Sequence, residues 1–351
     1  MRVLITGGAG FIGSRLALAL LRRGHDITCV DDLSGAIDWR NLSEEYEYAD
    51  AATTPDGTTL RMIATDCASM PHMREVVEAY GPFDVVAHAA ANAREGASQF
   101  QPHSICYRNL LAASAVLATT LNAGTRRFVV FSSMSVYGAQ LPPFDESMGH
   151  VPEDVYGVNK AAVEDVTRIL CEVHGAEYLI LRPHNVFGEG QALHDKHRNV
   201  VAIFMNRIMQ GEHLFVYGDG EQTRAFSYID DSLPCFVRAV EGVGVDIPAR
   251  VVNVGGIAHA TVNDLAQAVK AAMGVDADYP VVYHRDRPRE VKHAYSTYEL
   301  SQTALGYDER VGWREGVNRM AAWARERGPQ SWVNREEMEI ASGLLPVPWR
   351  E

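Results

Sequence analysis

The sequence predicts an α/β fold built on a doubly wound parallel sheet, with a smaller, interwoven α/β lobe. Short β-branched runs alternate with segments of helical period from residue 2 to about residue 182. A glycine-rich turn joins the first strand to the first helix. The length of 351 residues allows one large domain or two interlocked ones.

The alternation defines each expected element of the sheet. The expected strands are Val3–Thr6, Ile27–Asp31, Leu60–Ile63, Val85–His88, Phe128–Ser132 and Tyr178–Leu181. The expected helices are Ile12–Arg23, Met70–Tyr80, Ser104–Asn122 and Tyr156–His174. The polar, acidic stretch 34–59 is expected to form a surface excursion between the second and third strands.

The chain is expected to leave the sheet and return to it. After Leu181 the alternation loosens, and a helix from about Asn199 to Gln210 opens a smaller lobe. The chain is expected back at the sheet around Phe226–Val240 and Val251–Val254. The resulting division gives a domain built on the sheet with residues 1–182 and 225–255, a second lobe of residues 183–224 and 256–330, and a tail of residues 331–351 with no assigned function.

Composition excludes several classes of protein. The chain has 32 Lys plus Arg against 45 Asp plus Glu, a formal charge of −13, which disfavours binding to nucleic acid or anionic membranes. No signal peptide or membrane span is recognisable. The five cysteines form no CxxC pair, so a reducing, cytoplasmic setting is expected. His184, His194 and His197 do not have the spacing of metal ligands, so no metal is expected.

The turn Thr6-Gly7-Gly8-Ala9-Gly10-Phe11-Ile12-Gly13 lies where a Rossmann-type fold binds the pyrophosphate of a dinucleotide. Glycines permit the tight turn and the close approach of a phosphate, and the helix N-terminus offers free N–H groups. Asp31 ends the second strand, where a carboxylate binds an adenosine ribose and repels a 2′-phosphate, which favours NAD over NADP. Asp32 could share that role, and Asp66 suits the adenine edge.

Tyr156 and Lys160 are four residues apart and therefore share one face of a helix. A phenol is a poor base at neutral pH unless a nearby cation stabilises the phenolate. The segment Ser132-Ser133-Met134-Ser135-Val136-Tyr137-Gly138 follows an apolar strand and could bring a hydroxyl to the same reacting oxygen. This combination predicts a catalytic site for hydrogen transfer.

The blocks TGGAGFIG, HAAAN, SSxxVYG, YxxxK, RPxNVxG and GDGxQTRxF occur in this order. In these blocks the chain resembles the extended short-chain dehydrogenase/reductases, specifically the NAD-dependent nucleotide-sugar epimerases and dehydratases. The resemblance covers about residues 1 to 327 and implies a homodimer that binds NAD and a UDP- or GDP-linked sugar. It implies that Ser133, Tyr156 and Lys160 are catalytic.

The resemblance also implies the binding residues. Cofactor positions are Gly7, Gly10, Phe11, Ile12, Gly13, Asp31, Asp32, Asp66, Cys67, Ala89, Ala90, Asn109, Ser132, Tyr156, Lys160 and Pro183. Substrate positions are Ser133, Asn185, Asn199, Val200, Tyr217, Arg224, Arg287 and Glu290. Arg289 could equally take the place of Arg287.

Two positions narrow the reaction. Dehydratases of the family place an Asp-Glu pair directly after the catalytic hydroxyl residue, and decarboxylases keep the Glu, whereas this chain has Met134 and Ser135. Neither can serve as the acid or base of an elimination. We therefore expect C4 epimerisation through a transient 4-keto sugar. A 4-keto reductase or dehydrogenase is the second interpretation, a dehydratase is disfavoured, and an NAD-binding sensor is the non-enzymatic alternative.

The sugar remains open. The galactose-pathway epimerases carry a lysine near the substrate where this chain has Ala93. Glucose, N-acetylglucosamine, glucuronate and larger octose-type sugars are all compatible with the sequence, as are UDP and GDP.

Overall fold

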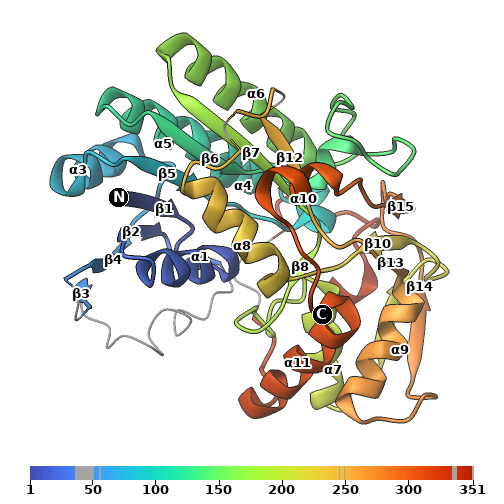
Figure 1. Ribbon diagram of the computed structural model, residues 1–351. Helices are drawn as coiled ribbons and strands as arrows, with labels where there is room; N and C mark the ends of the chain where they lie inside the picture. Colours follow the sequence, from blue (N-terminus) through green and yellow to red (C-terminus); the bar gives the residue numbers. More distant parts are fainter. Residues whose placement is uncertain (36–50, 55–56, 245, 249, 334–337, 350–351) are drawn as a thin grey trace.

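A computed structural model describes residues 1–35, 51–54, 57–244, 246–248, 250–333 and 338–349. An eight-stranded sheet in the order β12-β7-β6-β5-β1-β2-β4-β3 forms its centre (Figure 1). Seven of its strands are parallel, and β3 pairs antiparallel at one edge. The strands are β1 (Arg2–Thr6), β2 (Asp26–Asp31), β3 (Ala51–Thr53), β4 (Thr59–Ala64), β5 (Val85–His88), β6 (Arg127–Phe131), β7 (Glu177–Pro183) and β12 (Val251–Val254).

Helices cover both faces of the sheet (Figure 1). One face carries α3 (Met70–Tyr80), α5 (Ala112–Asn122) and α6 (Val155–His174), and the other carries α1 (Phe11–Leu21) and α8 (Ile229–Val240). Successive side chains of a strand point to opposite faces of the sheet. Leu4 of β1 therefore packs in the core under α3, α5 and α6, whereas Val3 and Ile5 pack in the core under α1 and α8. Burial of both faces explains why these strands read as continuous apolar runs.

The second lobe shares its apolar core with the α1 and α8 face of the sheet. Its helices are α7 (Val200–Met209), α9 (Val262–Met273), α10 (Glu299–Leu305) and α11 (Gly312–Arg327). Its short strands are β8 (Val186–Phe187), β9 (Leu214–Tyr217), β10 (Thr223–Ala225), β13 (His259–Thr261), β14 (Val281–His284) and β15 (His293–Ala294). β11 (Ser227–Tyr228) belongs to the segment that returns to the sheet, and it pairs with β8. A single turn, η4 (Val347–Trp349), follows. None of the helices in the described part of the chain is long and apolar enough to cross a bilayer.

The predicted fold class is confirmed, and the six expected strands lie in the sheet. Because β12 returns to pair with β7, we propose the division into two interwoven domains unchanged. The excursion over 34–59 contributes the edge strand β3, and its residues 36–50 and 55–56 lie outside the described part.

Two expected elements differ from the structure. Ser104–Asn122 was expected as one helix, but the chain forms α4 (Pro102–Cys106), the π-helical η2 (Tyr107–Leu111) and then α5, after the 3₁₀ turn η1 (Glu95–Phe100). A π-helical segment has no periodicity signal of its own and is frequent at functional sites. Within Phe226–Val240 the chain does not pair with the main sheet, because α8 packs against it as an amphipathic helix.

A buried charge network fixes α6 on the sheet. The Glu164 carboxylate accepts hydrogen bonds from Ser132 at 2.5 Å and from Arg182 of β7 at 2.6 and 2.9 Å, and contacts His150 at 2.9 Å. Burial opposes the charged form of Glu164, but these bonds outweigh it and hold the pKa at about 2, below the ordinary 4.5. The 3₁₀ turn η3 (Met134–Tyr137) follows β6 and leads toward α6.

We predict that Glu164→Gln lowers the free energy of unfolding by about 3–5 kcal/mol, because it leaves the buried Arg182 guanidinium without a counter-charge. The matched control is Glu172→Gln on the same helix, whose carboxylate forms the solvent-exposed ion pair with Arg168 and should change stability by less than about 1 kcal/mol. Urea unfolding followed by circular dichroism measures both.

The pH dependence follows from the same carboxylate. Its folded pKa is depressed, so its contribution to stability is complete above pH 4.5 and is lost as the pH falls toward 2. Stability should therefore fall less steeply in this window for Glu164→Gln than for the wild type. Equal slopes would contradict the assigned role.

Candidate active site

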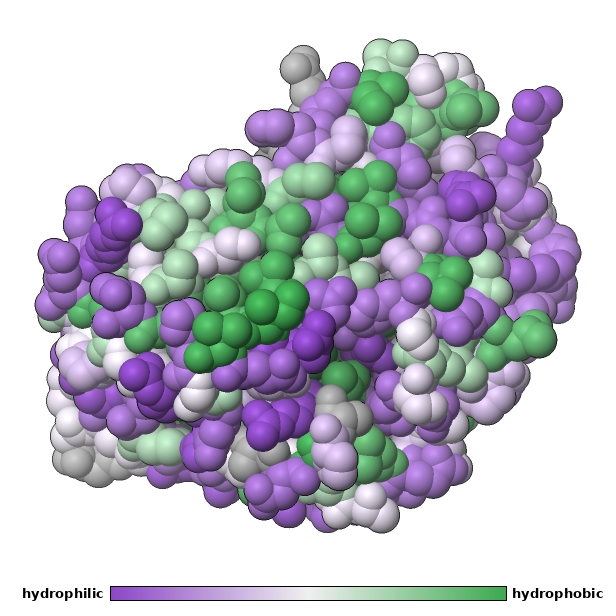
Figure 2. Space-filling model, turned by 90° about the horizontal axis from the view of Figure 1, so that it is seen from above, coloured by the Kyte–Doolittle hydropathy of each residue, from purple (hydrophilic) through white to green (hydrophobic). Residues whose placement is uncertain are grey.

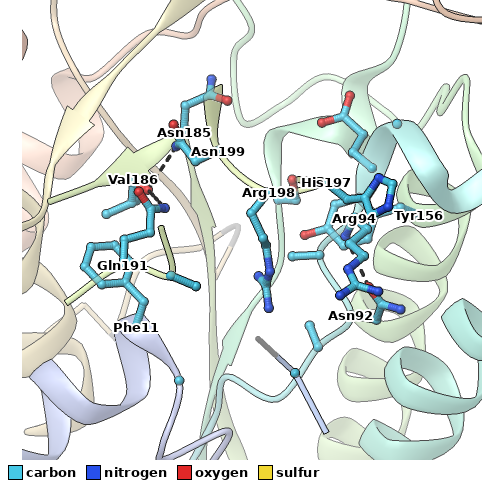
Figure 3. A pocket seen from close by; sticks show the side chains of 18 of the residues that line it. Phe11, Asn92, Arg94, Tyr156, Asn185, Val186, Gln191, His197, Arg198 and Asn199 are labelled. Carbon is cyan, nitrogen blue, oxygen red and sulfur yellow. Dashed lines mark hydrogen bonds between the residues drawn. The ribbon is translucent and has the colours of Figure 1, made fainter. Parts of the chain in front are cut away.

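A cavity of about 430 Å³ lies between the sheet and the second lobe, where the carboxyl ends of the parallel strands meet (Figure 3). It is lined by the turn after β1, the ends of β2, β5, β6 and β7, the start of α6 and several loops of the second lobe. Every site residue predicted from the sequence lines this cavity except Asn109. One continuous pocket therefore joins the expected cofactor and substrate sites.

The glycine turn closes one end of the cavity. Gly7 has φ +71°, and a Cβ there would lie 2.7 Å from the backbone nitrogen of Ala90. A Cβ on Gly13 would lie 2.1 Å from the Gly7 carbonyl oxygen. Gly10 precedes the first turn of α1 and provides no side-chain cap, so N–H groups of this turn remain available to a phosphate. This local structure fits the pyrophosphate of a dinucleotide.

Acidic side chains at the ends of β2 and β4 define the adenosine end. Asp31 is 6% exposed and accepts hydrogen bonds from the Ala9 and Leu33 backbone nitrogens. Burial raises its pKa, against the effect of the Leu33 bond. Asp32 instead pairs with Arg108 at 2.6 Å. Asp66 accepts the Tyr107 hydroxyl at 2.6 Å, and Cys67 follows it in the cavity wall.

Asn109 lies behind this wall. Its side chain forms two hydrogen bonds with the backbone of Asn92, at 2.8 and 3.1 Å, and is 1% exposed. The structure therefore places Asn109 as a support of the loop after β5, whereas Ala89, Ala90 and Pro183 line the cavity itself. The position of Asn109 in sequence does not show this, because the bond depends on the turn at Asn92.

The three residues predicted to be catalytic come together on the cavity wall. Tyr156 and Lys160 project from the first turns of α6, and Ser133 follows the end of β6 and hydrogen-bonds the Tyr156 phenol. The Lys160 ammonium donates to the Phe131 carbonyl at 2.7 Å and lies 5.8 Å from the centre of the Tyr156 ring. Asp154 caps α6 by accepting from the Gly157 nitrogen at 2.7 Å, which fixes where the helix begins.

The protein alone favours the protonated phenol. Burial raises the pKa of Tyr156 above its ordinary value, while the Ser133 bond lowers it and the carboxyls of Glu95 and Asp154 raise it further. Burial lowers the pKa of Lys160 to about 8. Formation of a phenolate therefore requires additional positive charge near the phenol oxygen.

Met134 and Ser135 occupy the positions next to Ser133. Met134 is 9% exposed, and its sulfur lies 3.7 Å from the Asn185 amide nitrogen. The Ser135 hydroxyl is buried without a hydrogen-bond partner among the residues described. Neither side chain brings a carboxyl group to this part of the cavity.

Two arginines of the second lobe also line the cavity. Arg224 and Arg287 both bind the Glu290 carboxylate, at 2.7 and 2.6 Å, and the Arg287 guanidinium lies 5.4 Å from the centre of the Tyr217 ring. Arg289 does not line the cavity and pairs with Glu153. Of the two arginines, the structure places only Arg287 in the cavity wall. Glu290 spaces the two guanidinium groups, which suit a diphosphate.

The loop after β7 brings three more predicted residues to the wall (Figure 3). Asn185 has φ +37° and donates to the Ala225 carbonyl at 3.0 Å. Asn199 caps α7 by accepting from the Val201 nitrogen at 3.0 Å, and Val200 begins that helix. The capping pattern explains why a helix begins here and directs its N-terminus toward the cavity.

Several lining residues were not predicted from the sequence. They are Arg94, Glu95, Arg108, Lys196, His197, Arg198 and Trp349. Arg198 and His197 lie in the loop after β7. The several His and Arg residues of that loop could have indicated a binding role from the sequence. Trp349 has no such signal, because its segment shows no periodicity and meets the cavity only through tertiary packing. Across the described ranges, no three His, Cys, Asp or Glu side chains cluster as metal ligands.

The fold and the cavity define a Rossmann-type dinucleotide-binding protein with a second-lobe site for a phosphorylated ligand. The model of the NAD dependent epimerase/dehydratase family matches residues 3–255. The chain belongs to this family, and the resemblance to the extended short-chain dehydrogenase/reductases is confirmed.

Individual relatives match the sequence of this chain over nearly its whole length. UDP-glucose 4-epimerase of Mycolicibacterium smegmatis is 27% identical over 93% of this chain and 99% of its own length. A UDP-N-acetyl-α-D-glucosaminuronate decarboxylase of Bacillus cytotoxicus is 26% identical over 93% of this chain and 98% of its own. The structure of Thermus thermophilus UDP-glucose 4-epimerase with NAD is 26% identical, with a TM-score of 0.80, and the match covers 92% of this chain and 98% of that one. NAD as the cofactor is confirmed.

We predict that Asp31→Ala weakens NAD binding by roughly 10- to 100-fold, because it removes charge-assisted hydrogen bonds to the ribose. Binding of NADP should weaken less, because the repulsion of its 2′-phosphate is also removed. Asp32→Asn is the matched control, since the Asp32 carboxylate is already paired with Arg108. Calorimetric titration with both cofactors measures the effects, and a larger loss of NAD affinity in Asp32→Asn would contradict the assignment.

Proposed function

We propose that this protein catalyses the C4 epimerisation of a nucleoside-diphosphate sugar, with Tyr156 as the base. The observation that carries the proposal is the convergence of Ser133, Tyr156 and Lys160 on one cavity, between the glycine turn and the Arg224–Arg287 pair. The UDP-glucose 4-epimerases among the relatives support it.

The two ends of the cavity position the substrate. Arg224 and Arg287 would bind the diphosphate, and Tyr217 and Glu290 beside them would contact the nucleoside. A sugar joined to that diphosphate then reaches toward Tyr156. Because the nucleotide stays bound, the 4-keto sugar can rotate in the cavity after C4 has lost its hydrogen.

Tyr156 and its neighbours move the proton. The phenolate oxygen of Tyr156 accepts the proton of the sugar 4-hydroxyl, and the Ser133 hydroxyl hydrogen-bonds the same oxygen as it becomes a carbonyl. NAD held by the glycine turn and Asp31 would supply the hydride chemistry at C4, with no net consumption of cofactor in an epimerisation. Tyr156 then gives its proton back to the C4 oxygen.

Charge around Tyr156 explains the need for Lys160. The phenol has a pKa raised by burial, and the Ser133 bond opposes that rise only in part. Lys160 lies within 5.8 Å of the ring centre, and its ammonium together with an oxidised nicotinamide would stabilise the phenolate. The base thus forms only when the cofactor is bound in its oxidised state.

A dehydratase reaction requires groups that these positions lack. Elimination at C5 and C6 needs an acid and base next to Ser133, and Met134 and Ser135 supply neither. A 4-keto reductase or dehydrogenase would use the same three residues but would exchange cofactor at every turnover. NMR of the sugar ring, with NADH absorbance recorded in parallel over a panel of UDP- and GDP-sugars, separates these reactions.

The apolar face between α5 and α6 favours a homodimer. Ala68, Met70, Leu111, Ser114, Ala115, Ala118, Val166, Ile169 and Leu170 line a shallow groove there. Leu111 is 51% and Ile169 is 48% exposed. Figure 2 views the molecule from the side of these helices and shows hydrophobic side chains gathered on it.

The five free cysteines fit a cytoplasmic location.

We predict that Tyr156→Phe lowers kcat for epimerisation by roughly 10²- to 10⁴-fold, because it removes the group that takes and returns the proton. Binding of the nucleotide sugar should remain. Tyr283→Phe, in the exposed strand β14, is the matched control and should keep full activity. Undiminished epimerisation in Tyr156→Phe would refute the assignment of the base.

We also predict that the wild type is a dimer by light scattering and that Leu111→Glu with Ile169→Glu makes it a monomer. Each charge placed on the α5–α6 face would be desolvated in the dimer. Leu141→Glu, at a residue that is 86% exposed elsewhere, is the control and should stay dimeric. A monomeric wild type would overturn the proposed assembly.

A further inference from the structure

Two consecutive residues of the π-helical η2 contact the acidic ends of two neighbouring strands. The Tyr107 hydroxyl donates to the Asp66 carboxylate at 2.6 Å, just after the end of β4. The Arg108 guanidinium donates to the Asp32 carboxylate at 2.6 Å, directly after the end of β2. Because π-helical turns are frequent at functional sites, this contact suggests more than a structural role for η2. The turn brings a guanidinium group to the adenosine end of the cavity.

The Asp32–Arg108 pair belongs to the cavity wall and is accessible from the cavity. Both residues line it, and the Asp32 and Arg108 side chains are 32% and 29% exposed. Ser34 holds the pair in place. Its backbone nitrogen donates to Asp32 at 3.0 Å, and its hydroxyl donates to Asp32 at 2.5 Å while accepting from Arg108.

The pair lies beside the residue assigned to the adenosine ribose. Asp31 directly precedes Asp32, and it is tied to the glycine turn by the hydrogen bond from the Ala9 nitrogen at 3.2 Å. In Rossmann-type folds a carboxylate at this strand end binds the ribose 2′-hydroxyl of NAD, whereas an arginine nearby accommodates the 2′-phosphate of NADP. The wall therefore holds both kinds of group, and its arginine is bound by a second carboxylate.

The charges of these groups oppose a phosphate. The carboxylates of Asp31, Asp32 and Asp66 line this end of the cavity with the Arg108 guanidinium, so negative charge exceeds positive charge among the four groups. A 2′-phosphate would bring up to two further negative charges to them. With Asp32 neutral, the Arg108 charge would no longer be cancelled by its partner, and a guanidinium is a strong ligand for phosphate.

We propose that the Asp32–Arg108 pair makes the cofactor site selective for NAD over NADP. Asp32 and Ser34 hold the Arg108 guanidinium in the wall, and the Asp32 charge cancels the positive charge that a 2′-phosphate needs. Arg108 is thus a latent ligand for the 2′-phosphate that Asp32 keeps out of use. The inference concerns the cofactor alone, so it does not depend on which sugar reaction the protein catalyses.

The first experiment measures this selectivity as the ratio of the dissociation constants for NAD and NADP. Wild type and Asp32→Asn are titrated with each cofactor by calorimetry. Asn keeps the shape of the Asp side chain and an oxygen that accepts hydrogen bonds, but it carries no charge. The affinity for NADP relative to NAD should rise roughly three- to tenfold in Asp32→Asn, because an uncancelled guanidinium then faces the 2′-phosphate.

The second experiment tests whether Arg108 is the phosphate ligand. In the double variant Asp32→Asn with Arg108→Gln, the gain in relative NADP affinity should disappear. Arg108→Gln alone should lower the relative affinity for NADP, because the Asp32 charge is then uncancelled. The gain in Asp32→Asn should also shrink between about 0.01 and 1 M salt, since partly exposed charges are screened.

The double variant also separates Arg108 from a second cation. Burial raises the pKa of Asp31, and the Arg198 guanidinium is among the groups that oppose this rise, so its charge also acts on this end of the cavity. If Arg198 rather than Arg108 bound the 2′-phosphate, the gain in Asp32→Asn would survive Arg108→Gln. That result would overturn the inference.

Asp308→Asn is the matched control. It removes the same charge from another Asp–Arg pair, in which Asp308 lies 2.7 Å from Arg310, and neither residue lines the cavity. The ratio of dissociation constants should stay at the wild-type value. An unchanged ratio in Asp32→Asn, or a wild type that binds NADP as tightly as NAD, would also overturn the inference.

Discussion

The position of α6 depends on buried charges that can be paired in only one register. Tyr156, Lys160 and Glu164 are spaced by four residues on one face of α6. Lys160 donates to a carbonyl of β6, and Glu164 binds Ser132 and Arg182 at the ends of β6 and β7. A slide or rotation of the helix would leave a buried charge unpaired. The unpaired charge would destabilise the fold by more than new packing contacts could stabilise it. This constraint places the Tyr156 phenol in the cavity wall.

The interwoven path of the chain makes the cavity possible. The sheet provides the glycine turn and the acidic residues for the cofactor, while the second lobe provides two arginines around Glu290. A protein with a formal charge of −13 thereby concentrates guanidinium groups where a diphosphate would bind. Because β12 returns to β7 after the second lobe has begun, both halves of the site are tied to one sheet.

The segment over residues 338–349 has only one short turn, η4, yet it places Trp349 in the cavity wall. Its carboxylate Glu339 binds two backbone nitrogens, and Trp349 fills the space beside Tyr217 and His197. A large aromatic side chain adds wall area at a low entropic cost, because it has only two side-chain torsions to fix. The substrate end of the cavity is thus built from groups far apart in the sequence.

Most of the fold follows from the sequence, because local rules decide it, whereas the resemblance to the family's sequence blocks supplied most of the cofactor and substrate positions. Short apolar runs that alternate with helical segments predict the strands, and the glycines after β1 predict the turn. The four-residue spacing places Tyr156 and Lys160 on one face of a helix. Tertiary packing alone decided that Asn109 supports a loop, that Arg287 and not Arg289 faces the cavity, that Ser104–Asn122 contains a π-helical segment, and that Trp349 reaches the site. These outcomes depend on contacts between distant segments, and no local pattern of residues encodes such contacts.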